Sequence, residues 1–172
     1  MSEDQKSKSL RILQFARQME LDGHNFFKEK AESFRSPVTK ELFLKLAEAE
    51  YEHYKYIEEE IKSYADSTDD YKVNEEFLNR DESSIFNLRA QSENIDTTMT
   101  ESDVPNLTVI RMAYLIEKDF KEFYQESAEE IDDPEIKKLL EKLADWEAGH
   151  ERLFKTEYNR MKKEYLTLPW GG

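Results

Sequence analysis

The sequence repeats itself: residues near the start of the chain recur near its end at one constant offset. Glu20 matches Glu117 and His53 matches His150, with 97 positions separating the members of each pair. Other pairs keep this register without a gap: Asp22 with Asp119, Phe26 with Phe123, Pro37 with Pro134, Leu46 with Leu143, and Glu50 with Glu147. A match held over this length indicates that the chain duplicates one structural unit.

Each copy of the repeat predicts two helices joined by a short turn. The chain has only four Gly and four Pro, which favours long uninterrupted helices. Pro37 and Pro134 follow the turns and lie in the first turn of a helix, where proline is tolerated. The expected helices span residues 9–34, 37–64, 106–131 and 134–165. We therefore expect an all-α four-helix bundle, built as a single domain over residues 1–172 from two repeated αα-hairpins.

A long connection, about residues 65–105, separates the two copies. It is rich in Asp, Ser, Thr and Asn, but it contains short apolar groups at residues 77–78 and 85–88. We expect an ordered crossover with one or two short helices. A crossover of this length lets the third helix point in either direction relative to the second.

Composition excludes several classes of function. The chain has no cysteine, so it cannot form a disulfide framework, a thiolate nucleophile or an iron–sulfur cluster. Its formal net charge of −14 repels phosphate backbones, so we expect no nucleic-acid partner. No apolar run reaches the roughly 18 residues that a membrane span needs. The polar N-terminus does not resemble a signal peptide, so we expect a cytoplasmic protein.

Each expected helix carries one glutamate in the middle of its apolar face. Residues three and four apart share a helix face, and the four apolar stripes are interrupted by Glu20, Glu50, Glu117 and Glu147. Burying a bare carboxylate costs several kcal/mol, and four that face one another also repel. Two divalent cations would balance these four charges. The pattern therefore predicts two metal ions in the bundle core.

Two histidines strengthen this prediction. Glu50-x-x-His53 and Glu147-x-x-His150 each place an oxygen and a nitrogen ligand on one helix face, one turn apart. One such motif is a weak signal, but two in register with a core glutamate form the known ligand pattern of dimetal carboxylate bundles. The predicted ligands are Glu20, Glu50, His53, Glu117, Glu147 and His150. Mixed carboxylate and imidazole ligation suits iron or manganese, and zinc is also possible.

Other polar and aromatic residues near these positions are expected to have structural roles. His24 follows Glu20 by one turn and is expected at the rim or in solvent. Tyr54 and Trp146 are expected to pack beside the ligands. The residues expected in the core are Phe26, Phe27, Phe123 and Tyr124. Asp22 and Asp119 match between the repeats, and either a supporting position behind the ligands or a surface position is open to them.

At these residues the chain resembles the rubrerythrin branch of the ferritin-like superfamily. The resemblance covers about residues 10–64 and 107–160. It includes sequence that flanks the ligands, such as Phe43-Leu44-Lys45-Leu46-Ala47-Glu48. It implies a ferritin-like four-helix bundle whose six ligands hold two iron ions and act in catalysis through them. It also implies an oxidoreductase that cycles between Fe(II) and Fe(III), with peroxide or oxygen as oxidant, an external electron donor and a homodimeric assembly.

The sequence departs from the rubrerythrin pattern in two ways. It has no cysteine for a rubredoxin module, so electrons would come from a separate protein. Rubrerythrins also usually carry an extra carboxylate one turn after a helix ligand, where this chain has Gly23 and Phe120. A six-ligand site fits ferroxidase, oxygenase or metal-holding roles as well as peroxidase activity. The alternatives are a non-catalytic iron storage or delivery protein, a di-iron hydroxylase, and a scaffold without metal.

Overall fold

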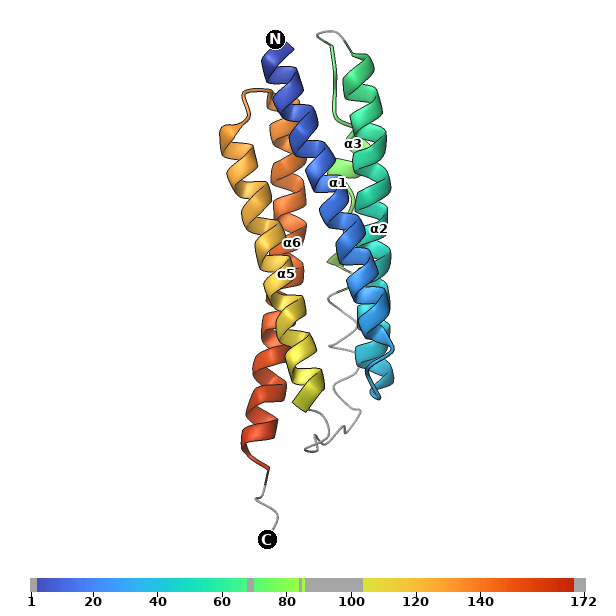
Figure 1. Ribbon diagram of the computed structural model, residues 1–172, viewed down its shortest axis with the longest axis vertical. Helices are drawn as coiled ribbons and strands as arrows, with labels where there is room; N and C mark the ends of the chain where they lie inside the picture. The colour runs from blue at the N-terminus through green and yellow to red at the C-terminus, as the bar shows by residue number, and fades with distance from the viewer. Residues whose placement is uncertain (1–2, 68–69, 84, 86–103, 169–172) are drawn as a thin grey trace.

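Four long helices and one short helix have defined bounds within the part of the chain that the structure describes. The computed structural model describes residues 3–67, 70–83, 85 and 104–168. The helices are α1 (Glu3–Ala31), α2 (Pro37–Asp66), α3 (Glu75–Leu78), α5 (Val104–Glu130) and α6 (Pro134–Leu166). The closest packing is between α1 and α2 and between α5 and α6, and α1 also contacts α5. The predicted all-α bundle of two αα-hairpins is therefore confirmed (Figure 1).

The direction of the second hairpin explains the long connection between the repeats. In Figure 1, α2 and α5 both run upward, and α1 and α6 run downward. The end of α2 and the start of α5 therefore lie at opposite ends of the bundle. One expected short helix is found as α3. The apolar residues at 86–88 lie outside the described residues.

Local signals set the starts of the second helix in each hairpin. The Ser36 hydroxyl accepts a hydrogen bond from the Thr39 backbone N–H, and Asp133 accepts from the N–H groups of Glu135 and Ile136. Both caps precede a proline at the first helical positions. Such caps satisfy N–H groups that have no partner inside the helix.

The first helix of each hairpin begins earlier than expected. The helix α1 starts at Glu3 rather than at Ser9, and α5 starts at Val104 rather than at Asn106. Ser9 is buried inside α1, and its hydroxyl donates to the Gln5 carbonyl at 3.2 Å. The acidic first turn of α1 explains its extension, because negative charge there complements the helix dipole.

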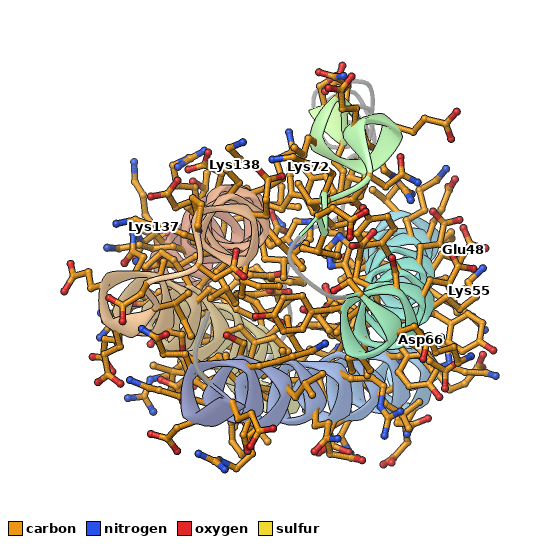
Figure 2. All side chains as sticks on the ribbon, turned by 90° about the horizontal axis from the view of Figure 1, so that it is seen from above. Glu48, Lys55, Asp66, Lys72, Lys137 and Lys138 are labelled. Atoms are coloured by element: carbon orange, nitrogen blue, oxygen red, sulfur yellow. The ribbon has the colours of Figure 1, made fainter. Side chains whose placement is uncertain are left out.

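The described part of the crossover packs over α2 and α6. Phe77 of α3 is buried, and its ring stacks on Tyr56 of α2 with centroids 3.4 Å apart. The same ring meets Trp146 of α6 edge-on at 4.5 Å. Viewed from above, α3 lies over the side of the bundle formed by α2 and α6, opposite α1 (Figure 2).

Buried carboxylates also anchor this segment. Glu60 of α2 accepts hydrogen bonds from the Tyr71 hydroxyl and from the Asn74 backbone N–H. Glu135 of α6 accepts from the Val73 backbone N–H at 3.2 Å. Because buried N–H groups need partners, these contacts fix where the crossover backbone lies.

The apolar core consists of two clusters, one toward each end of the bundle. One cluster includes Leu13, Ala16, Ile57, Tyr124 and Leu143. The other includes Phe27, Phe43, Leu46, Ile110 and Phe154. Burying one such side chain contributes about 1.5–3 kcal/mol, which helps to offset polar burial elsewhere. Along every long helix, the predicted ligands lie between members of the two clusters.

Charged side chains cover the outside of the bundle. Glu48 and Lys55 of α2 and Lys137 and Lys138 of α6 are exposed and project outward in Figure 2. Among the described residues, no helix has the length and apolar character needed to cross a membrane.

Candidate metal centre

The structure brings all six predicted ligands together in the middle of the bundle. Each has an exposed fraction of 0%, although the set comprises four glutamates and two histidines: Glu20, Glu50, His53, Glu117, Glu147 and His150. Helical periodicity explains the arrangement, because Glu50 and His53 lie one turn apart on the inner face of α2. Glu147 and His150 have the same relation on α6.

These side chains form two overlapping groups, each of which could hold a metal ion. The first group is Glu20, Glu50, His53 and Glu147, and the second is Glu50, Glu117, Glu147 and His150. Within each group, one ligand atom from every residue lies within 4.8 Å of the others. Glu50 and Glu147 belong to both groups, so the helices that carry the E-x-x-H motifs supply the shared carboxylates.

The histidines present their Nδ1 atoms to the carboxylates. His53 Nδ1 lies 3.3 Å from Glu20 Oε2 and 3.5 Å from Glu147 Oε1. His150 Nδ1 lies 3.2 Å from Glu147 Oε2, 3.4 Å from Glu50 Oε1 and 3.5 Å from Glu117 Oε2. Nδ1 is therefore the ring nitrogen that faces the candidate metal positions.

Several carboxylate oxygens in the cluster have no hydrogen-bond partner among the described residues. Both oxygens of Glu50, both of Glu117 and Oε1 of Glu147 are buried and unsatisfied. Some of them lie at ion-pair distance from a histidine but without hydrogen-bond geometry. Buried anionic oxygens are costly unless paired. The donor set of carboxylates and imidazoles therefore fits two divalent cations, which would supply the missing partners.

The protonation of the metal-free cluster reflects this crowding. Burial, followed by the negative charge of Glu147, raises the pKa of Glu50 well above its usual range. Burial also raises the pKa of Glu117, and the charge of His150 does not offset it. Burial has the largest effect on Glu147 too, but His150 outweighs it and lowers the pKa of that carboxyl. The cluster thus retains protons that incoming cations would displace.

Neighbouring carboxylates favour the protonated form of both histidines in the metal-free protein. Burial is the largest influence on each and lowers its pKa, but neighbouring carboxylates reverse the shift. For His53 these are chiefly Glu82 and Glu20, and for His150 chiefly Glu117 and Glu147. The net result raises both pKa values well above the ordinary histidine value.

Glu82 of the crossover also belongs to the site, and the sequence did not predict it. Its Oε1 atom lies 2.9 Å from His53 Nε2, and its Oε2 atom lies 3.1 Å from His150 Nε2. Burial is the largest influence and raises the pKa of Glu82, but the two histidines outweigh it and lower the pKa. Glu82 lies in an acidic, irregular stretch outside the two copies of the repeat. Neither helical periodicity nor the repeat could therefore predict it as a site residue.

Tyr124 is buried in the core as expected, and its hydroxyl donates a hydrogen bond to Glu20. Burial and the charge of Glu20 raise the pKa of Tyr124 well above the usual tyrosine value. Phe27, which matches Tyr124 in the repeat, has no hydroxyl. Glu117, which matches Glu20, has no hydrogen-bond partner on either oxygen. The two halves of the site are therefore chemically different.

The other candidate residues have structural positions. His24 Nδ1 lies 2.7 Å from the Ala47 carbonyl oxygen, and His24 is in neither candidate metal group. Trp146 stacks on His53 with centroids 4.8 Å apart, which confirms a packing role. Tyr54 stacks on Tyr51 at 5.7 Å.

The two matched aspartates, Asp22 and Asp119, are exposed. Asp22 accepts a hydrogen bond from Gln18 on the surface. Of the two positions left open to the aspartates, the surface position is the one observed.

The positions one turn after Glu20 and Glu117, where the resemblance led us to expect a further carboxylate, carry Gly23 and Phe120. Phe120 is 9% exposed and packs against Gly23. A Cβ atom on Gly23 would lie 3.1 Å from Phe120 Cε2 and 3.3 Å from Glu50 Oε2. Gly23 therefore makes room for the ring, and this pair forms apolar packing where a seventh ligand could otherwise lie.

Comparison with known proteins agrees with this geometry. No curated protein and no solved structure matches the chain. The family model for rubrerythrin matches residues 11–158, which include all six predicted ligands and Glu82. The chain therefore belongs to the rubrerythrin family.

Proposed function

We propose that this chain is a non-haem di-iron oxidoreductase that reduces peroxide or oxygen. The observation that carries the proposal is the pair of overlapping four-residue groups with unsatisfied carboxylate oxygens at their centre. The ligand pattern of dimetal carboxylate bundles supports the same function.

The proposed ligand roles follow from how the two groups overlap. Glu50 and Glu147 belong to both groups and would help to hold both ions. Glu20 and His53 would complete one position, and Glu117 and His150 would complete the other. Four carboxylates and two neutral imidazoles then balance two divalent cations. Iron suits this mixture of hard oxygen and imidazole ligands, while manganese and zinc remain alternatives.

The bound iron would supply electrons and a Lewis-acidic centre for cleavage of an O–O bond. One peroxide, two ferrous ions and two protons give two water molecules and two ferric ions, so the paired site matches the two-electron reaction. The protein's part is to hold both positions with shared carboxylates and to surround them with buried side chains. The chain has no cysteine, so re-reduction needs a separate electron donor. A cytoplasmic homodimer remains our expectation for the assembly.

A second candidate function is non-catalytic iron binding, for storage or delivery. The observation that favours it is the replacement of the extra carboxylate by the Gly23–Phe120 contact. A storage protein needs a multimeric shell, whereas a redox enzyme needs repeated turnover with a donor. Native mass together with peroxide turnover therefore separates the two functions. A di-iron hydroxylase would use the same ligands and is a further alternative.

Metal content tests the proposal directly. The protein is made in iron-supplemented cells, purified without chelator and analysed by plasma mass spectrometry, with about two irons per chain expected. The ferrous form is then mixed anaerobically with peroxide, and about one peroxide should be consumed per two irons oxidised. Near-zero iron, with no uptake on anaerobic Fe(II) titration, would overturn the proposal. Two ions of manganese or zinc would keep the site and remove the support for iron redox chemistry.

A further inference from the structure

Glu82 connects the two histidines through opposite ends of one carboxylate. Its side chain is only 2% exposed, and each of its oxygens contacts a different ring: Oε1 contacts His53 Nε2, and Oε2 contacts His150 Nε2. The two rings are nearly parallel, with an interplanar angle of 11° and centroids 6.1 Å apart. A single side chain from the crossover thus lies behind one histidine of each repeat.

The chemistry of a carboxylate determines what this contact does to the rings. An ionised carboxylate only accepts hydrogen bonds, so both Nε2 atoms must carry a proton. In a neutral imidazole, the lone pair is then on Nδ1, the atom that faces the glutamate cluster. Partners of this kind fix ring orientation and tautomer and make the ligand nitrogen more basic. Glu82 therefore prepares both histidines for metal binding at the same time.

The crossover positions Glu82 through contacts with both motif-bearing helices. Arg80 forms an ion pair with Glu52 of α2, and its Nε atom lies 3.9 Å from Glu82 Oε1. Phe77 packs against Trp146 of α6, which in turn stacks on His53. The position of the crossover on α2 and α6 thus decides where the Glu82 carboxylate lies.

We propose that Glu82 is a positioning residue that sets both histidines as Nδ1 ligands through its direct contacts with their Nε2 atoms. The proposal rests on the proposed function, because it concerns how the chain prepares the same site. It adds a residue outside the two repeats whose removal affects both metal positions.

A substitution series tests the proposal by changing the number of acceptor atoms. Glu offers two acceptors to the histidines, Gln offers one acceptor and one donor, and Ala offers none. In E82Q the amide N–H₂ group faces one Nε2 atom, so that ring must place its proton on Nδ1. Cobalt(II) titration should therefore show one position weakened about 10–100-fold in E82Q and both positions weakened in E82A.

A matched control separates this role from general loosening of the crossover. E60Q alters another buried glutamate of similar exposure, which binds the crossover through Tyr71 and Asn74 and contacts neither histidine. E60Q should keep cobalt affinity at both positions within about threefold of wild type. Loss of affinity in E60Q as large as in E82Q would overturn the proposal. Unchanged affinity in E82Q and E82A would also overturn it.

Histidine nitrogen NMR on the zinc-loaded wild type shows which ring nitrogen carries the proton. This measurement does not depend on the folding of any variant. The chain has only three histidines, so His53 and His150 can be assigned, with His24 as an internal reference. Both should carry the proton on Nε2 and bind zinc through Nδ1. A proton on Nδ1 of either ring would overturn the proposal.

The same spectra separate failure of this proposal from failure of the proposed function. If the wild type bound neither zinc nor cobalt, the proposed function would fail. The metal-free spectra would still decide the role of Glu82. Two hydrogen-bonded Nε2–H signals in wild type and one in E82Q would support it, and equal numbers in the two proteins would overturn it.

Discussion

Phe120 packs so closely over Gly23 that a Cβ atom on that glycine would lie 3.1 Å from its ring. The two residues occupy matching positions in the repeat, one turn after Glu20 and Glu117. One copy therefore has no side chain at the position where the other copy has a large ring. The glycine also lies beside Glu50, because its Cβ would be 3.3 Å from Glu50 Oε2.

A carboxylate introduced at position 120 should increase the rate of peroxide reduction. F120E places an acidic group one turn after Glu117, against Gly23. We expect F120E to bind about two irons and to consume peroxide at least tenfold faster than wild type, because a further anionic ligand stabilises ferric iron. Stopped-flow mixing of the ferrous protein with peroxide measures the rate. F120Q is the matched control, and equal acceleration in F120Q would show that charge is not the cause.

Substitution of a ligand that belongs to both groups should reduce the number of bound metal ions more than substitution of a ligand that belongs to one group. Glu50 and Glu147 belong to both candidate groups, whereas Glu20 belongs to one. We therefore expect E50A and E147A to lose both ions and E20A to retain about one. Metal content per chain measures this, with exposed Glu48 changed to Ala as the control. Retention of two ions by E50A would show that the ligand assignment is wrong.

The stability of the metal-free protein should fall as pH rises. The pKa of Glu50 is raised in the folded state, so the folded chain binds more protons than the unfolded chain above the ordinary value of 4.5. The raised pKa values of His53 and His150 act in the same direction above 6.5. Urea unfolding between about pH 6 and pH 9 should show a falling free energy of unfolding. Metal affinity should rise over this range, because binding displaces these protons.

Glu50→Gln provides the control for this pH dependence. Gln resembles the protonated carboxyl and cannot ionise, so E50Q should make the metal-free protein more stable than wild type at pH 8. It should also reduce the slope of stability against pH. A metal-free E50Q protein that unfolds at lower urea than wild type would count against a crowded, charged core.

Loss of the Tyr124 hydroxyl should destabilise the protein through Glu20. The Tyr124→Phe substitution keeps the ring but leaves one buried oxygen of Glu20 without its donor. We expect a loss of about 1–3 kcal/mol in the free energy of unfolding of the metal-free protein. Urea denaturation at pH 7 measures it, and Tyr51→Phe on the exposed surface is the matched control. A Y124F protein as stable as Y51F would show that the hydrogen bond contributes nothing.

The sequence allowed the bundle and the six predicted ligands to be placed because both depend on helical periodicity. Glu50 and His53 lie one turn apart on an apolar stripe, so their common face follows from the spacing alone. The repeat then placed Glu147 and His150 in the same arrangement. The starts of α1 and α5 were less predictable. No helix breaker stands immediately before Ser9, and Pro105, immediately before Asn106, is the second residue of α5, where a helix accepts proline.

Only the tertiary structure decided how the two copies combine. The sequence shows that Glu50 and Glu147 face inward, but their membership of both groups depends on how four helices cross. The Tyr124–Glu20 hydrogen bond likewise joins different repeats, so no local pattern predicts it. Glu82 lies in an irregular segment without periodicity, and its position between His53 and His150 depends on packing of the crossover against α2 and α6. Local spacing thus determined which side chains point inward, and long-range packing decided which of them meet.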